Sequence, residues 1–312
     1  MVFQMNKTEL TQLISKNFDY YQTGHVADYI PALAKVDPKQ LGMAIYDLQE
    51  NHLIEAGDAN VRFAVESMSK VPVLLLAIKD NGIDHVFQKI NTEPTGFAFN
   101  SIMNMEINHR KHPMNPFVNA GAIATTSLIN GKNAEEKFDR ILAFMKEICD
   151  DPAITLNEEI YQSESRTGDI NRSLAYYMKG NQMIEGDVPA ILDTYFKQCS
   201  VNVTAVGIAK LAAVLANKGI APWNGQRIVS EKSATIVKSI MTIAGLYDES
   251  GEFSVHVGVP AKSGVGGGLL AAVPNRYGMG VFSPALDSFG NSAAGIQLLT
   301  DVIQELDADI FE

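Results

Sequence analysis

The order of strand-like and helix-like segments leaves few folds open to this chain. Residues 41–48 and 52–56 have strand character and flank the turn-forming stretch 49–51, which predicts a β-hairpin. Strand patterns return only after about residue 240, whereas the segments between 69 and 216 have the apolar spacing of helices. This order predicts an antiparallel sheet assembled from both ends of the chain, with an inserted helical lobe.

Further elements follow from the same patterns. Helices are expected from Lys7 to Asn17 and from about 292 to 306. The C-terminal part predicts strands over 253–260 (FSVHVGVP), 265–273 and 277–282, and a Pro-Asn turn separates the last two. These strands complete the sheet that the N-terminal hairpin begins.

We expect a single catalytic domain over residues 1–312. No repeat, low-complexity tract or Pro/Gly/Ser-rich linker divides the sequence. Within it, a sheet lobe is expected over about 1–68 and 240–312, and a helical lobe over about 69–239. Hydrophobic residues make up 46% of the chain and charged residues 20%, as is typical of a packed soluble protein.

Charge and cysteine content limit the partners. Twenty-five Lys and Arg against 36 Asp and Glu give a net charge of −11, so we expect no binding to nucleic acid or to a membrane. Cys149 and Cys199 lack the short spacing of a zinc or redox site, which predicts two buried free thiols and no metal. Without a visible signal peptide or a run of ~20 apolar residues, the expected location is cytoplasmic.

The first chemical motif is Ser67-Met68-Ser69-Lys70, which follows the strand-like stretch RFAVE and opens an apolar helix. At this spacing both side chains share one helix face, so the Lys70 amine can take the Ser67 hydroxyl proton without a histidine. Lys70 must then be neutral, which requires burial or nearby positive charge to lower its pKa from ~10.4. By itself, the motif is also compatible with Ser67 acting only as a helix N-cap.

A second motif, Lys262-Ser263-Gly264, strengthens the chemical interpretation. A Lys-Ser/Thr-Gly triplet late in the chain is the usual companion of Ser-x-x-Lys in serine β-lactamases and penicillin-binding proteins. The Ser-Asp-Asn motif of β-lactamases is absent from the sequence. A β-lactamase or D-Ala-D-Ala peptidase is therefore a disfavoured alternative.

Five further segments resemble the serine-dependent glutaminases, and all five occur in the family's order. They are Tyr29-Ile30-Pro31, 112–123 (HPMNPFVNAGAI), 163–171 (SESRTGDIN), 195–200 (YFKQCS) and 245–248 (GLYD). The resemblance runs from about Tyr29 to the final helix. It implies an α/β (α+β) fold of the β-lactamase/DD-peptidase type and hydrolysis of the side-chain amide of L-glutamine to L-glutamate and ammonia. It also implies a Ser-Lys acyl-enzyme mechanism, no cofactor and a homodimer or homotetramer.

The resemblance also implies roles for particular residues. Ser67 matches the nucleophile, Lys70 the group that activates it, and Tyr247 a tyrosine that assists proton transfer. Val265 matches a residue whose backbone N–H joins that of Ser67 in the oxyanion hole. The implied substrate-binding residues are Tyr29 (at the pocket rim), Ser67, Asn119, Glu164, Asn171, Tyr195, Tyr247 and Val265.

Elementary chemistry agrees with this set. Glutamine carries an ammonium, a carboxylate and an amide, so its pocket needs a buried anion and several donors. Glu164 is the one carboxylate in the predicted set; Asn119, Asn171 and Tyr195 supply donors. Taken singly, Glu164 is also compatible with a solvated loop carboxylate, Asn171 with a helix cap and Tyr195 with a core ring. A non-catalytic amino-acid-binding protein on the same fold is a further alternative, which ammonia release from glutamine would exclude.

Overall fold

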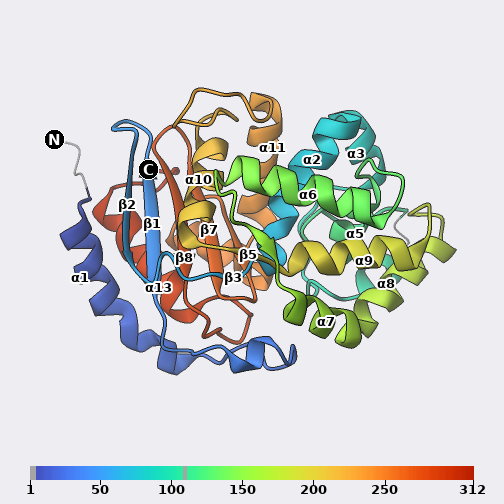
Figure 1. Cartoon of the computed structure of the whole chain (residues 1–312), viewed down its shortest axis with the longest axis horizontal. Helices are drawn as coiled ribbons and strands as arrows, with labels where there is room; N and C mark the ends of the chain where they lie inside the picture. Colours follow the sequence, from blue (N-terminus) through green and yellow to red (C-terminus); the bar gives the residue numbers. More distant parts are fainter. Residues whose placement is uncertain (1–4, 108–110) are drawn as a thin grey trace.

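The structure, a computed structural model, describes residues 5–107 and 111–312 (Figure 1). Its main sheet has five antiparallel strands in the order β2-β1-β8-β7-β6. The strands are β1 (Gly42–Asp47), β2 (His52–Gly57), β6 (Ala261–Gly264), β7 (Gly268–Val273) and β8 (Tyr277–Phe282). Because β1 pairs with β8, the sheet joins both ends of the chain, as the sequence predicts.

Both predicted tight turns are present. Asn51, between β1 and β2, has φ 50°, and Asn275, between β7 and β8, has φ 59°. Asparagine adopts this left-handed conformation more readily than most residues. In the first turn, the Asp47 carboxylate also accepts the backbone N–H groups of Gln49 and Glu50. Local turn chemistry therefore sets the register of both hairpins.

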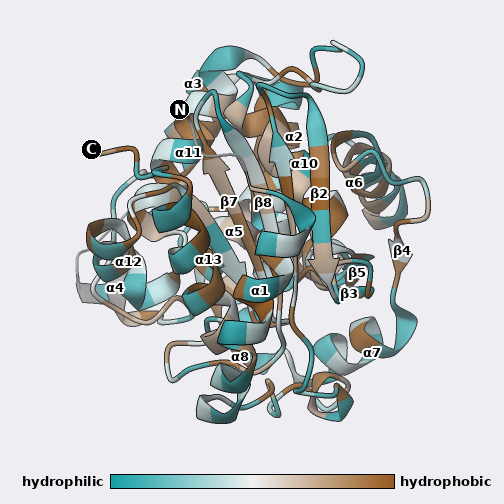
Figure 2. Ribbon diagram, turned by 90° about the vertical axis from the view of Figure 1, so that its left-hand side faces the viewer, coloured by the Kyte–Doolittle hydropathy of each residue, from teal (hydrophilic) through white to brown (hydrophobic). Residues whose placement is uncertain are grey.

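Helices cover both faces of the sheet. On one face lie α1 (Lys7–Asn17) and α13 (Ala293–Glu305), and on the other lies α10 (Ala205–Ala216). Side chains of β7 alternate between two apolar clusters: Leu269 packs on the α13 side and Leu270 on the α10 side. In Figure 2 the buried strand β7 is largely brown, whereas α1 and α8 carry teal surfaces.

Most of the remaining helices form the helical lobe, drawn mainly in cyan, green and yellow in Figure 1. They are α2 (Lys70–Asn81), α3 (Ile83–Lys89), α4 (Met103–Ile107), α5 (Asn119–Ser127), α6 (Ala134–Ile148), α7 (Glu158–Thr167), α8 (Asp169–Gly180), α9 (Val188–Cys199) and α11 (Glu231–Ala244). A small antiparallel sheet of β3 (Phe63–Ala64), β5 (Val201–Val203) and β4 (Thr155–Leu156) lies beside them. Short 3-10 helices are η1 (Phe18–Thr23), η2 (Leu33–Lys35), η3 (Glu66–Ser69) and η4 (Tyr247–Glu249).

Helix α10 belongs to the sequence segment expected in the helical lobe, yet it packs directly on the sheet. Glycines on β8 make this close approach possible. A Cβ atom at Gly278 would lie 2.1 Å from the backbone N of Ala213, and one at Gly280 would lie 2.1 Å from the backbone O of Ala205. Distances below 3 Å are excluded by van der Waals repulsion, so these positions require glycine.

The strand predicted over 253–260 is wrong. Residues Ser250–His256 form helix α12, and β6 begins only at Ala261. Phe253 and Val257, one helical turn apart, are both buried, whereas Val255 is 76% exposed. A strand would have placed all three on one face. The apolar alternation in FSVHVGV therefore has the wrong period for the structure it adopts.

No helix in the described part of the chain combines the length and the apolar character needed to cross a membrane. Both cysteines are free and buried, as predicted.

Candidate active site

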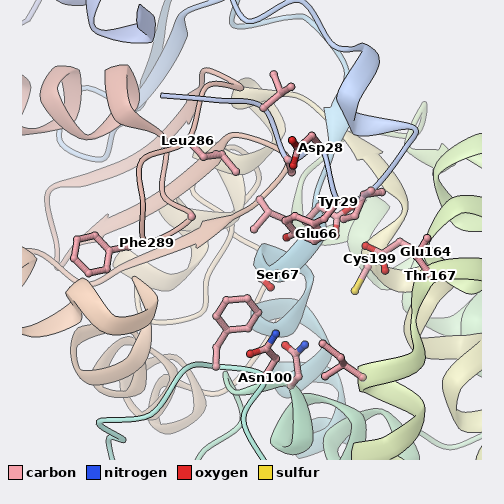
Figure 3. Close-up of a pocket in the computed structure, with 18 of the residues that line it drawn as sticks. Asp28, Tyr29, Glu66, Ser67, Asn100, Glu164, Thr167, Cys199, Leu286 and Phe289 are labelled. Atoms are coloured by element: carbon pink, nitrogen blue, oxygen red, sulfur yellow. The ribbon is translucent and has the colours of Figure 1, made fainter. Parts of the chain in front are cut away.

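A cavity of about 790 Å³ is lined by residues from both lobes. Figure 3 shows Ser67 near its centre, with Glu66 next to it and Glu164 to one side. Seven of the nine residues singled out from the sequence line this cavity: Tyr29, Ser67, Asn119, Glu164, Asn171, Tyr195 and Val265. The other two, Lys70 and Tyr247, are buried directly behind it.

Ser67 lies where β3 turns through η3 into α2. The N-cap position of α2 is occupied by Ser69, and no side chain caps the helix, so Ser67 does not serve as an N-cap. The end of β6 passes very close to this turn. A Cβ atom at Gly264 would lie 2.7 Å from the backbone O of Val65 and 3.3 Å from the backbone N of Ser67. Glycine at this position lets the strand approach the Ser67 backbone.

Lys70 is 2% exposed, and its Nζ atom donates two hydrogen bonds. One goes to the backbone O of Phe117, at 2.9 Å, and the other to Oδ1 of Asn119, at 2.8 Å. Within the described chain the Lys70 Nζ atom makes no hydrogen bond to the Ser67 hydroxyl, although the Lys70 backbone N–H donates to the Ser67 carbonyl. Burial lowers the pKa of Lys70 to about 8, which makes the neutral amine accessible near physiological pH.

Asn119 connects Lys70 to the cavity wall. Its Oδ1 accepts from Lys70, and its Nδ2 donates to Oδ1 of Asn171 at 2.9 Å. This fixes the amide orientation of both asparagines and leaves the Asn171 Nδ2 group available to the cavity. Asn171 lies inside α8, which begins at Asp169. The alternative in which Asn171 caps a helix is therefore wrong.

Tyr247 stands on η4 with φ 52°, an uncommon conformation for an aromatic residue. The centroids of the Tyr247 and Phe99 rings are 4.6 Å apart. The Lys262 Nζ atom lies 4.6 Å from the centroid of the Tyr247 ring. Burial raises the pKa of Tyr247, although the nearby hydroxyls of Ser67 and Ser263 oppose this rise. Tyr247 is therefore a neutral phenol beside Ser67.

Neither Lys262 nor Ser263 lines the cavity. Lys262 is fully buried and donates to the backbone O of Gly245, at 2.9 Å, and of Ser263, at 2.6 Å. The Ser263 hydroxyl donates to Oδ1 of Asn291 at 2.6 Å. These bonds tie β6 to the segment that carries Tyr247.

Glu164, on α7, is 9% exposed, which rules out a solvated loop carboxylate. It is not the only carboxylate here, contrary to the sequence interpretation. Glu66 also lines the cavity and is 3% exposed. Its position next to Ser67 was the available sequence signal, but the local pattern did not reveal its burial against Glu164.

The remaining predicted residues define the cavity walls. Tyr29 is 59% exposed and lies at the rim, whereas Tyr195 on α9 is buried with its ring against the cavity. Tyr195 is thus both part of the core and part of the wall. Val265 follows β6, and among the described residues no acceptor takes its backbone N–H. Cys199, which the sequence did not indicate as a cavity residue, also lines the wall.

Comparison with known proteins places this geometry in a family. The family model for glutaminase matches residues 24–311. Glutaminase 1 of Clostridium perfringens is 63% identical over 302 residues, covering 97% of this chain and 98% of that relative. Glutaminase 2 of the same organism is 50% identical over 305 residues, covering 98% and 100%.

Solved structures agree. A probable glutaminase from Bacillus subtilis complexed with 6-diazo-5-oxo-L-norleucine is 33% identical, with a TM-score of 0.90 over 100% of this chain and 99% of that one. The probable glutaminase ybaS is 37% identical, with a TM-score of 0.92 over 99% and 100%. The fold is that of the β-lactamase-like enzymes, as the sequence predicts. Within this class, the chain belongs to the glutaminase family.

Proposed function

We propose that this enzyme hydrolyses the side-chain amide of L-glutamine, with Ser67 as nucleophile and Lys70 as base. The observation that carries the proposal is the environment of the Lys70 amine. A neutral amine has two N–H donors and one lone pair. Two acceptors, Phe117 O and Asn119 Oδ1, take both donors. The lone pair is then free to accept a proton from Ser67, three residues earlier on the same face.

In the first half of the reaction, the Ser67 oxygen attacks the amide carbonyl and its proton passes to Lys70. The backbone N–H groups of Ser67 and Val265 are the proposed donors to the resulting oxyanion. The close passage of β6 past the Ser67 backbone supports this pairing. The proton then moves to the departing nitrogen, so that ammonia leaves and a glutamyl ester remains on Ser67. Water hydrolyses this ester and releases glutamate.

Tyr247 is proposed to relay the proton between Lys70 and the leaving nitrogen. Burial raises its pKa and keeps the phenol protonated, so it can donate one proton as it accepts another. Its ring is held between Phe99 and Lys262, which fixes the hydroxyl beside Ser67.

The substrate's α-amino and α-carboxylate groups are proposed to bind at the other end of the cavity. Glu164 is a buried acceptor for the ammonium; Asn171, Tyr195 and the rim residue Tyr29 offer donors to the carboxylate and amide. A related Bacillus subtilis glutaminase forms a covalent complex with 5-oxo-L-norleucine after reaction with 6-diazo-5-oxo-L-norleucine, which supports a nucleophile in this cavity.

An ammonia-release assay with glutamine, asparagine and a chromogenic cephalosporin in parallel tests the proposal. Ammonia from glutamine, with no cephalosporin cleavage, is the expected result. Mass spectrometry after acid quench should find a glutamyl group on the peptide that contains Ser67. Turnover without any such adduct under single-turnover conditions would contradict the acyl-enzyme step.

A further inference from the structure

Glu66 has a strained backbone conformation and a buried carboxyl group. It immediately precedes Ser67, has φ 45° and is almost fully buried. A left-handed backbone is strained at a residue with a long side chain and persists only where the surroundings impose it. Its Oε1 atom is also buried without a hydrogen-bond partner in the described part of the chain. An unpartnered buried acceptor beside the nucleophile indicates a missing donor.

Glu66 faces Glu164 across the cavity wall, and the two carboxyl groups interact. Burial raises the pKa of both. Their mutual hydrogen bond raises the pKa of Glu66 further and lowers that of Glu164, so the pair holds one proton between its two carboxyl groups. Two buried carboxylates in contact do not both ionise without a compensating cation.

The described side chains around the pair do not provide a cation that is hydrogen-bonded to it. Those that act on the pair are Lys70, Cys199, Tyr29, Tyr195 and Tyr247. Burial raises the pKa of the Cys199 thiol and of the Tyr195 and Tyr247 phenols, which keeps them neutral. Lys70 is the one cationic side chain among these described groups, and its N–H donors are directed at Phe117 and Asn119.

We propose that Glu66 and Glu164 together form the binding site for the substrate α-ammonium, and that the ammonium displaces the proton held by this pair. The inference rests on the proposed glutaminase function and adds a residue to its substrate site. An α-ammonium has three N–H donors, enough to satisfy Glu164 and the unpartnered Glu66 oxygen together. Glu66 is then a substrate-binding residue that also makes binding depend on pH.

The step balances without a further reactant. The O–H bond of the carboxyl pair breaks, its proton goes to the buffer, and the incoming ammonium replaces that proton as the compensating charge. No covalent bond to the substrate forms. One proton is released per glutamine bound. The dissociation constant for glutamine therefore falls about tenfold for each unit by which the pH rises, as long as the free pair holds its proton. An analogue without the α-amino group should release none.

Isothermal titration calorimetry at pH 7 tests the proposal. The full-length Ser67→Ala variant binds glutamine without turnover, and titrations in buffers of different ionisation enthalpy give the number of protons released. We expect about one proton with glutamine and about zero with the analogue that lacks the α-amino group. In Ser67→Ala/Glu66→Gln, the amide keeps the shape but holds no dissociable proton, so release should fall to about zero.

A matched control removes a different carboxylate from the same cavity. Asp28 lines the wall but is exposed, so Ser67→Ala/Asp28→Asn should still release about one proton. This comparison also separates Glu66 from any titration of Lys70, which both double variants retain. Equal proton release from the Glu66→Gln and Asp28→Asn variants would overturn the proposal. Equal proton release with glutamine and with the analogue would overturn it as well, and this comparison uses the Ser67→Ala variant with Glu66 unaltered.

Glutamine that binds without releasing a proton refutes this inference alone, whereas no ammonia from the unaltered enzyme refutes the proposed function.

Discussion

The two ends of the cavity are both buried, but they respond to burial in different ways. At the Ser67 end, burial lowers the pKa of Lys70 towards neutrality, and two acceptors satisfy the amine. At the Glu164 end, burial raises the pKa of two carboxyl groups, and one oxygen of Glu66 keeps no partner. The Lys70 amine is satisfied within the protein, whereas in our proposal the carboxyl pair is completed by the substrate ammonium. This difference separates the reacting group from the recognition group.

The largest effect is expected at the Ser67 end. Ser67→Ala should reduce kcat by about 10⁴-fold or more while leaving glutamine binding largely intact, because the nucleophile acts mainly in the transition state. Ser69→Ala is the matched control, since its hydroxyl is buried and does not line the cavity. Its kcat should stay within about threefold of the unaltered enzyme. Activity of Ser67→Ala within about tenfold would contradict the Ser-Lys mechanism.

Lys70 and Tyr247 test whether that end works as one unit. Lys70→Ala and Tyr247→Phe should each lower kcat by about 10²-fold to 10⁴-fold, and the double variant should be little worse than the more damaging single one. Groups that share one proton transfer lose their function together, which makes the losses non-additive. Single-turnover rates of all four enzymes give the coupling. Strictly additive losses would instead mean that the two residues act independently.

At the recognition end, a smaller effect is expected. Glu164→Gln keeps the shape but removes the charge, so kcat/KM for glutamine should fall by roughly thirtyfold to a few thousandfold. The variant should also discriminate far less between glutamine and the analogue without an α-amino group. Glu159→Gln, on the exposed side of the same helix, provides the control and should change kcat/KM little. If the variant and the unaltered enzyme lose the same factor on the analogue, Glu164 does not bind the ammonium.

The pH dependence of the two kinetic parameters distinguishes the two ends. Lys70 acts as a neutral base, so kcat should rise about tenfold per pH unit while Lys70 still carries its proton in the enzyme–substrate complex, and level off once it has lost it. The carboxyl pair titrates in the free enzyme and should therefore affect kcat/KM but not kcat. Profiles of both parameters from about pH 5 to 9, for the unaltered enzyme and for Glu66→Gln, separate these contributions. A kcat that is flat over this range would exclude Lys70 as the titrating base.

Local sequence patterns determined much of this protein. Turn residues such as Asn51 and Asn275 predicted the hairpins, and the strand segments at both ends predicted the sheet they share. The three-residue spacing of Ser67 and Lys70 placed both side chains on one face. Motif resemblance selected the residues that line the cavity. Such features depend on neighbouring residues, so a linear pattern records them.

The tertiary structure decided what depends on distant segments. Period alone did not distinguish helix α12 from a strand, because the burial of Phe253 and Val257 is set by the elements that pack against them. The placement of α10 on the sheet depends on Gly278 and Gly280 of a strand more than 60 residues away. The charge state of Glu66 likewise depends on Glu164, on another helix. Burial and electrostatic fields are sums over the whole fold, and for that reason the second carboxylate became visible only when the chain was folded.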